Sequence, residues 1–196
     1  SLENQHKLMT VKVESEVLRE TQLVVCLLFQ YAGMSFVDFA HLKERNIKNG
    51  ILDYNRQKTG TPMRLEILDT AELMRKELMG DKKPASGYLF PFLSGTKTGY
   101  EAYLEYNAAL SRFNRNLKAL KKAAGIASDV TSYTIRHSFA MALKEQNVPI
   151  EMISELLGHK SIKTTQIYLR SFSLEKMTEV NSTCFGCVYN YVSKVG

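Results

Sequence analysis

Four residues with charged or reactive side chains stand in order along the chain: Lys58, Arg136, His159 and Tyr168. The planar guanidinium group of an arginine suits a carboxylate or a phosphate, which it can hold through two parallel hydrogen bonds. Lysine and histidine can transfer protons, and a tyrosine hydroxyl can act as a nucleophile. Together the four form a set able to bind, protonate and attack a phosphodiester.

Taken alone, two of these residues have simpler interpretations. Arg136 shares its side of a predicted helix with three apolar residues, Phe139, Ala140 and Leu143. A buried guanidinium group requires an anionic partner, and an internal salt bridge would serve as well as a phosphate. Lys58 stands at the tip of a Lys-Thr-Gly hairpin, where a solvated lysine is ordinary.

The other two residues flank a short helix near the end of the sequence. Gly158 is expected to end one helix and Ser161 to cap the next, which holds His159 in a tight, polar corner. A histidine in a turn usually faces solvent, and Tyr168 taken alone would be a surface tyrosine. Only the joint order of the four residues favours the chemical interpretation.

Hydrophobic spacing and turn signals predict the elements that carry these residues. Strand-like composition around Ile47–Tyr54 and Met63–Ile67, interrupted by Lys58–Pro62, predicts a small antiparallel sheet. Helices are predicted at Val11–Tyr31, Ser35–Leu42, Thr70–Met79, Tyr103–Ala124, Ser132–Gln146, Ile150–Leu157, Ile162–Arg170 and Leu174–Val180. The expected fold class is mainly α with a small antiparallel β-sheet (α+β).

Composition sets the broad class. The chain has 196 residues, which fits a single domain over 1–196, and its net charge of +6 is compatible with a polyanionic partner. The longest apolar run, LVVCLLF, is too short to span a membrane, and no secretory signal is recognised. A cytoplasmic protein without membrane contact is the expectation.

The three cysteines do not indicate a metal centre. Cys26 lies in an apolar helical run and is expected in the core. Cys184 and Cys187 form a CxxC pair without a second CxxC or a histidine pair at zinc spacing, so we expect a reduced pair and no metal site.

The joint pattern resembles the catalytic domain of the tyrosine recombinases, the phage integrase family of DNA breaking and rejoining enzymes. The segment YTIRHSFAMALKEQNVPIEMISELLGHKSIKTTQIYLR is similar to the family's arginine helix, Leu-Gly-His turn and tyrosine helix, and GMSFVDFAHL and YNRQKTG supply two upstream landmarks. The likeness covers about Val11 to Phe172, which leaves the residues after about 172 as a C-terminal tail. The two landmarks look closest to integrases of conjugative and mobilisable transposons of gut anaerobes.

The resemblance implies a role for each residue. Tyr168 would attack the scissile phosphate to give a 3′-phosphotyrosyl link and a free 5′-hydroxyl. Arg136 would bind the nonbridging oxygens, Lys58 would protonate the departing 5′-oxygen, and His159 would hydrogen-bond the phosphate and assist proton transfer. The linkage keeps the energy of the broken bond, so rejoining requires no ATP, metal or other cofactor.

The sequence departs from the family pattern at its first arginine. That position is occupied by Ser35, and Ala32 occupies the slightly earlier position at which some relatives carry the arginine. Loss of one such donor should lower the rate by roughly 10² to 10³ unless another group replaces it. The nearest arginines in sequence are Arg19, Arg45 and Arg56, and the sequence does not distinguish among them.

A second departure is Tyr133, where the family usually has histidine. A phenol can donate a hydrogen bond to a phosphate oxygen but is a poor proton shuttle at neutral pH.

Four basic residues at helical spacing form a stripe of candidate DNA-binding residues: Arg112, Arg115, Lys118 and Lys122. A solvated helix face is an equally ordinary interpretation of this stripe.

The implied partners are double-stranded DNA attachment sites. The resemblance further implies a monomer alone, a tetramer on DNA, accessory DNA-bending or excision factors, a location at the bacterial nucleoid, and an N-terminal DNA-binding domain that this fragment lacks. Two other functions stay open: the same chemistry in a type IB topoisomerase or telomere resolvase, and a catalytically impaired DNA-binding relative.

Overall fold

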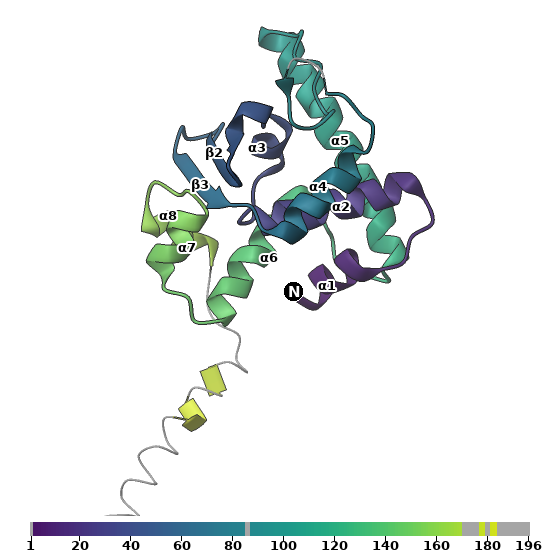
Figure 1. Ribbon diagram of the computed structural model, residues 1–196. Helices are drawn as coiled ribbons and strands as arrows, with labels where there is room; N and C mark the ends of the chain where they lie inside the picture. The colour runs from purple at the N-terminus through teal and green to yellow at the C-terminus, as the bar shows by residue number, and fades with distance from the viewer. Residues whose placement is uncertain (1, 85–86, 170–176, 179–180, 184–196) are drawn as a thin grey trace, which may run out of the picture.

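The central element of the computed structural model is α2 (Glu16–Gln30), whose residues 21–28 are all buried. It packs against α1 (Leu2–Thr10), α4 (Asp69–Met79), α5 (Gly99–Ala123) and α6 (Ser132–Glu145), as Figure 1 shows. The structure describes residues 2–84, 87–169, 177–178 and 181–183. Because neighbours surround α2, its apolar run forms the core, and Cys26 is buried there as predicted.

The prediction of one helix over Val11–Tyr31 is wrong at its start. The helix begins at Glu16, and an unpredicted helix, α1, ends at Thr10. Residues 11–15 form a non-helical link, in which Val11 and Val13 pack against the main core. The side-chain amide of Gln22 donates a hydrogen bond to the carbonyl oxygen of Val11 at 2.8 Å. Core contacts and this partly buried hydrogen bond therefore outweigh the helical spacing of the link.

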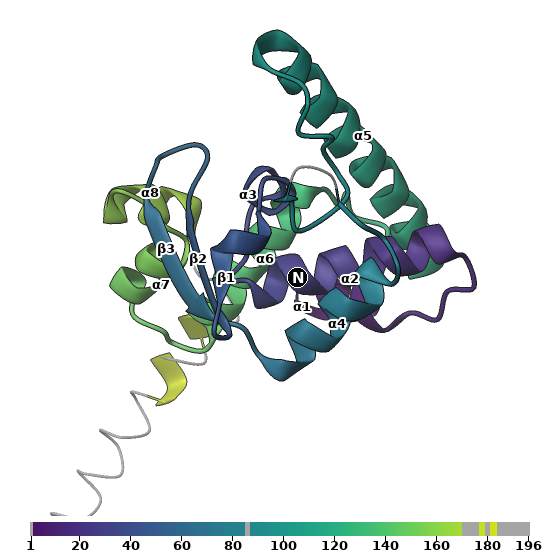
Figure 2. The ribbon, with the colours of Figure 1, turned by 45° about the horizontal axis from the view of Figure 1, so that its top comes forward.

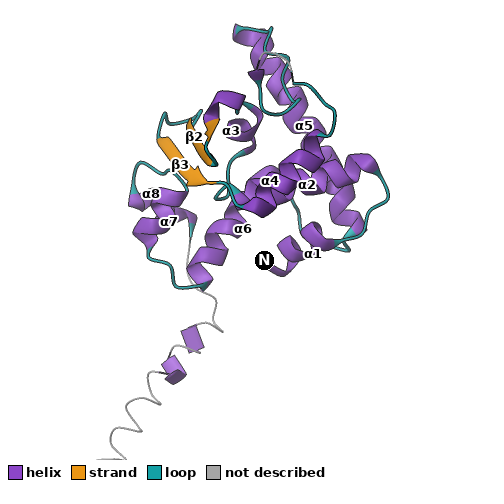
Figure 3. Cartoon of the chain, viewed as in Figure 1, coloured by secondary structure: helices purple, strands orange, loops and turns teal. Residues whose placement is uncertain are grey.

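The sheet has three antiparallel strands in the order β1 (Ile47–Lys48), β2 (Ile51–Asn55) and β3 (Pro62–Glu66). β2 and β3 form a hairpin in which Tyr54 pairs with Met63, so alternate residues of both strands face the interior. Figure 3 shows this small sheet among helices. The predicted fold class, mainly α with a small antiparallel sheet, is confirmed.

A tight turn follows α2 and leads into α3 (Phe36–Ala40). Ala32 and Gly33 both have positive φ, so the helix ends before Gly33, as predicted. Ser35 caps α3: its hydroxyl accepts from the Asp38 amide and donates to Asp38 Oδ2 at 2.5 Å. Ser35, which stands where the resemblance places the first arginine, is thus hydrogen-bonded to a buried carboxylate.

α5 is longer than predicted and begins at Gly99. Its buried residues are Ala109, Phe113, Leu117 and Leu120, whereas Tyr103, the apolar residue at which the helix was predicted to begin, is 58% exposed. Figures 1 and 2 show why: the N-terminal end of α5 extends beyond the other helices.

In the part of the chain that the structure describes, no helix has both the length and the apolar character needed to cross a membrane.

Three helices in the second half of the chain share a second, small hydrophobic cluster. α6, α7 (Ile150–Leu156) and α8 (Ile162–Tyr168) meet there, and the buried members of the cluster are Ala140, Ile153, Leu157 and Leu169. Phe139 joins this cluster to the main core through an edge-on contact with Phe29, at 5.3 Å between ring centroids. The predicted helix at Leu174–Val180 falls mostly outside the described residues, and so do Cys184 and Cys187.

Candidate active site

Arg136 joins the two hydrophobic clusters from its place on α6. Its side chain is buried, and Nη1 donates to the carbonyl oxygen of Gly33 at 2.8 Å while Nη2 donates to that of Leu157. No carboxylate within the described residues forms an ion pair with it, so the internal salt bridge is not what holds it there. Burial, and next the nearby Arg56, lower the pKa of Arg136. Arg136 is therefore a buried cation without an ion-pair partner among the described residues.

Tyr168 is the last residue of α8, and its ring is enclosed by three other rings. Those of Tyr133, His137 and His159 contact it edge-on, at 5.7, 5.2 and 5.8 Å between centroids. The hydroxyl is buried and has no hydrogen-bond partner within bonding distance among the described residues. Burial, and next the neighbouring Tyr133, raise the pKa of Tyr168. It is therefore a neutral phenol whose hydroxyl is buried although the residue is only half-buried, and the surface interpretation does not hold.

His159 occupies the turn between α7 and α8. Ser161 caps α8 as predicted by accepting from the amide of Lys163, and His159 Nδ1 lies 2.8 Å from the hydroxyl oxygen of fully buried Thr165. Burial, and next Arg136, lower the pKa of this histidine to about 4. His159 is thus neutral near pH 7, and its second ring nitrogen can exchange a proton or a hydrogen bond with a neighbour.

Arg56 also enters this site, where it follows the last residue of β2. Its Nε donates to Asp38 Oδ2 at 3.4 Å and its Nη1 donates to the carbonyl oxygen of Gly158 at 3.0 Å, with the side chain 8% exposed. Leu52 and Tyr54 face the interior, and Arg56 continues that alternation. The period of two along ILDYNR was the sequence signal that could have identified it. Nothing comparable marked Asp38 or His137, which sequence reasoning missed.

The other two nearby arginines make no described contact with this site. Arg19 forms two hydrogen bonds to the carboxylate of Glu77 on α4, at 2.7 and 2.9 Å. Arg45 is exposed in η1 (Glu44–Asn46), a short 3₁₀ helix before the sheet. Of the three arginines closest in sequence to the vacant position, Arg56 is the one that contacts residues of the site.

Lys58 lies in the exposed loop between β2 and β3 and forms no hydrogen bond or ion pair with any residue that the structure describes. Figures 1 and 2 both show this hairpin beside α8. The hairpin borders the histidine turn, since Arg56 binds Gly158. Lys58 thus follows Arg56 by two residues in the sequence, but no hydrogen bond or ion pair with a described residue fixes its side chain in the site.

These elements match a known family. A model of the phage integrase family matches residues 3–175. The chain belongs to the phage integrase family. The tyrosine recombinase XerD of Lacticaseibacillus casei is 52% identical over 54 residues, which cover 28% of this chain and 18% of that protein.

The fold of this chain is similar to that of solved recombinase and integrase structures. The XerA recombinase has a TM-score of 0.68 and 20% identity, covering 93% of this chain and 62% of that one. The Tn1549 transposon integrase, in complex with a circular intermediate DNA, has a TM-score of 0.64 and 14% identity, covering 90% and 63%. The chain thus spans less than two thirds of the solved structures and about a fifth of the XerD relative.

The predicted DNA-binding residues of this family member are all exposed on α5: Arg112, Arg115, Lys118 and Lys122. Asn114 Oδ1 accepts from the amide of Ser132 at 3.0 Å, which places the start of α6 against this part of α5. Lys118 lies one turn after Asn114, on the same side of the helix. Arg112 instead lines a cavity with Val17 and Glu20. The stripe is therefore divided between two sides of α5.

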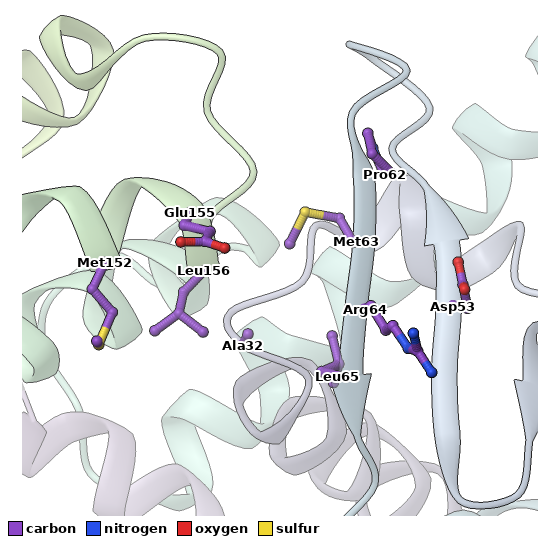
Figure 4. Close-up of a pocket in the computed structure, with 9 residues that line it drawn as sticks. All are labelled: Ala32, Asp53, Pro62, Met63, Arg64, Leu65, Met152, Glu155 and Leu156. Carbon is purple, nitrogen blue, oxygen red and sulfur yellow. The ribbon is translucent and has the colours of Figure 1, made fainter.

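An open groove lies between β3 and α7, next to the histidine turn. It measures about 570 Å³, and Figure 4 shows Met63 and Leu65 facing Leu156 and Met152 across it. Met63 also lies against Gly158, so one side chain forms a wall of both the groove and the turn that carries His159.

Gly158→Ala is expected to lower the free energy of unfolding more than Gly125→Ala. Both glycines have positive φ, +60° and +66°, so alanine costs about 1–2 kcal/mol of backbone strain at either position. A Cβ at Gly158 would also meet Met63 Sδ and lie 2.6 Å from Arg56 Cδ, whereas one at Gly125 has no neighbour within 4 Å. Overpacking should add about 1–3 kcal/mol. Urea unfolding measures both losses, and equal losses would contradict a tightly packed turn.

Proposed function

We propose that this chain is the catalytic domain of an enzyme that breaks and rejoins DNA strands at specific sites through a phosphotyrosyl intermediate. The observation that supports it is that His159 contacts the ring of Tyr168 and that Arg136 is near enough for its charge to act on the tyrosine, whose hydroxyl is buried. An unpaired cation, a neutral histidine and a phenol form a set that can bind a phosphodiester and transfer its phosphoryl group to the tyrosine.

The reaction requires one bond to form and one to break. The phenolic oxygen of Tyr168 attacks phosphorus, and the bond from phosphorus to the 5′-oxygen breaks. The phenolic proton passes to neutral His159, and the ammonium group of Lys58 protonates the departing 5′-oxygen. Arg136 stabilises the charge that builds on the nonbridging oxygens. The reverse reaction, with a 5′-hydroxyl of another strand, restores a phosphodiester and the free tyrosine, so no external energy source or cofactor is required.

Access to the tyrosine must change when DNA binds. Beside Tyr168 lies an open cavity of about 530 Å³, lined also by Tyr133 and His137. The hydroxyl of Tyr168 is closed off from solvent, so a phosphate has to displace part of its cover. Tyr133, 62% exposed, lies at the cavity and would donate a hydrogen bond to a phosphate oxygen there.

The partner in this proposal is an attachment site in double-stranded DNA. The Tn1549 integrase of similar fold was solved with a circular intermediate DNA, which supports DNA as the substrate and a mobile element as the source. Lys118 and Arg115, next to the start of α6, would contribute salt-dependent phosphate contacts. Assembly as a tetramer on DNA, accessory bending or excision factors, a conjugative-transposon origin and a place at the nucleoid belong to the same proposal.

A trapping experiment tests it with the full-length protein. The attachment site is read from the junction between the element and the chromosome, and a duplex nicked near the cleavage position is labelled on one strand. We expect a covalent complex on a denaturing gel that carries the DNA on its 3′-phosphate side. Binding without any adduct would favour the impaired DNA-binding relative and would contradict the proposed function.

A further inference from the structure

We propose that Arg56 binds the scissile phosphate as its second cation, in place of the arginine that is missing at Ser35. This inference rests on the proposed function, because it assigns a further catalytic residue to the same reaction. It differs from the family pattern in the origin of the charge. The guanidinium group comes from the end of a β-strand and not from the helix that begins after Ser35.

A hydrogen-bonded chain links the vacant position to Arg56. The hydroxyl of Ser35 donates to Asp38 Oδ2, and Arg56 Nε donates to the same oxygen atom. The other oxygen, Oδ1, accepts from the amide of Gln57 at 2.7 Å. Asp38 is fully buried at its side chain and holds both the main chain and the side chain at the end of β2. The arginine is therefore directed toward the place that Ser35 leaves without a cation.

The two buried arginines lie side by side at the histidine turn. Arg136 donates to the carbonyl oxygen of Leu157 and Arg56 to that of Gly158, the two residues that precede His159. Adjacent residues are about 3.8 Å apart at their Cα atoms, so the two guanidinium groups and the imidazole share one small region. Burial lowers the pKa of His159 most, and the charges of Arg136 and Arg56 lower it further. This spacing suits a single tetrahedral anion.

The charge of this cluster is not balanced. Asp38 is the one carboxylate paired with either arginine within the described residues, which leaves two guanidinium groups for one acid. Nε and Nη1 of Arg56 are engaged, whereas Nη2 has no hydrogen bond to a residue that the structure describes. A phosphate would supply both the missing negative charge and an acceptor for Nη2.

A scaffold role is the competing explanation, since Arg56 also fixes the turn through Gly158. The two roles differ in their response to the charge of the substrate. A methylphosphonate, in which a methyl group replaces one nonbridging oxygen, carries no negative charge at the scissile position. A cation that serves to neutralise the phosphate becomes dispensable on that substrate, whereas a scaffold residue is equally necessary on both.

The test compares Arg56→Ala with the wild-type protein in the trapping assay, using a phosphate and a methylphosphonate at the scissile position. We expect adduct formation to fall roughly 10² to 10³-fold on the phosphate, and the two proteins to differ by only a few-fold on the methylphosphonate. Arg45→Ala, an exposed arginine before the sheet, is the matched control and should change neither rate. An equal loss on both substrates, or no loss on the phosphate, would overturn the assignment.

Two further variants keep the test informative if alanine unfolds the turn. Arg56→Gln removes the charge and Arg56→Lys retains it, and we expect only the glutamine variant to recover on the methylphosphonate. Ser35→Arg should not accelerate the wild-type protein, but it should restore part of the lost rate in the Arg56→Gln background. A strong acceleration of the wild type would mean that Arg56 leaves the site short of a cation.

The outcomes separate this inference from the proposed function. A wild-type protein that forms no adduct contradicts the function itself. An adduct that requires Tyr168 but is indifferent to Arg56 leaves the function in place and contradicts only the assignment of Arg56.

Discussion

Tyr168→Phe is expected to abolish the covalent protein–DNA complex and to leave the fold intact. The substitution removes the one atom that can attack phosphorus. That atom is buried and forms no hydrogen bond of normal geometry with the described residues, and the nearby hydroxyl of exposed Tyr133 can bond to water, so removal of the Tyr168 hydroxyl leaves no group unsatisfied. Burying an unpaired hydroxyl costs free energy, so the free energy of unfolding should stay the same or rise by about 1 kcal/mol. Few active-site substitutions separate catalysis from stability so clearly.

The measurement combines the denaturing gel with urea unfolding, and Tyr133→Phe is the matched control. Tyr133 contacts the same ring from the exposed side, and its substitution should still allow the adduct to form. Binding of the attachment site, followed by gel shift, should be unchanged in Tyr168→Phe, whereas Tyr133→Phe, which loses one hydrogen bond to a phosphate oxygen, should bind somewhat more weakly. An adduct that persists in Tyr168→Phe would place the nucleophile elsewhere and remove the basis of the mechanism.

Local spacing was sufficient to predict most of the fold. The helices from α5 to α8 were predicted with errors of zero to four residues at their ends, because each combines a regular apolar spacing with a glycine or a capping residue nearby. The error at residues 11–15 has a different origin. Val11 and Val13 fit a helical pattern, but core packing and Gln22 hold the link in a non-helical conformation, which the local sequence does not reveal.

The site was predictable as a set of residues but not as an arrangement. Arg136, His159 and Tyr168 could be selected by type and order, whereas the enclosure of the tyrosine hydroxyl depends on how α6 packs against α8. Arg56 shows the same limit. Alternation along β2 predicts that it faces inward, but only the carboxylate of Asp38, supplied by a different element, decides which of three arginines approaches Ser35.

Lys58→Ala is expected to slow cleavage by roughly 10² to 10⁴-fold, the usual contribution of a general acid. The departing 5′-oxygen is a strong base, comparable to hydroxide from water, whose pKa is about 15.7. It therefore requires a proton as the bond to phosphorus breaks. Lys58 is exposed on the hairpin loop beside α8 and has no partner among the described residues, so it is free to move toward DNA.

A substrate with sulfur in place of the bridging 5′-oxygen identifies the role of this lysine. A thiol has a pKa of about 8.5, so a thiolate leaves without a proton donor. The wild-type protein and Lys58→Ala should then cleave at nearly the same rate in the trapping assay. Lys48→Ala, an exposed lysine on β1 of the same sheet, is the control and should behave as wild type on both substrates. If Lys58→Ala is equally slow on oxygen and sulfur, the lysine binds DNA and some other group donates the proton, because a pure binding contact is insensitive to the leaving atom.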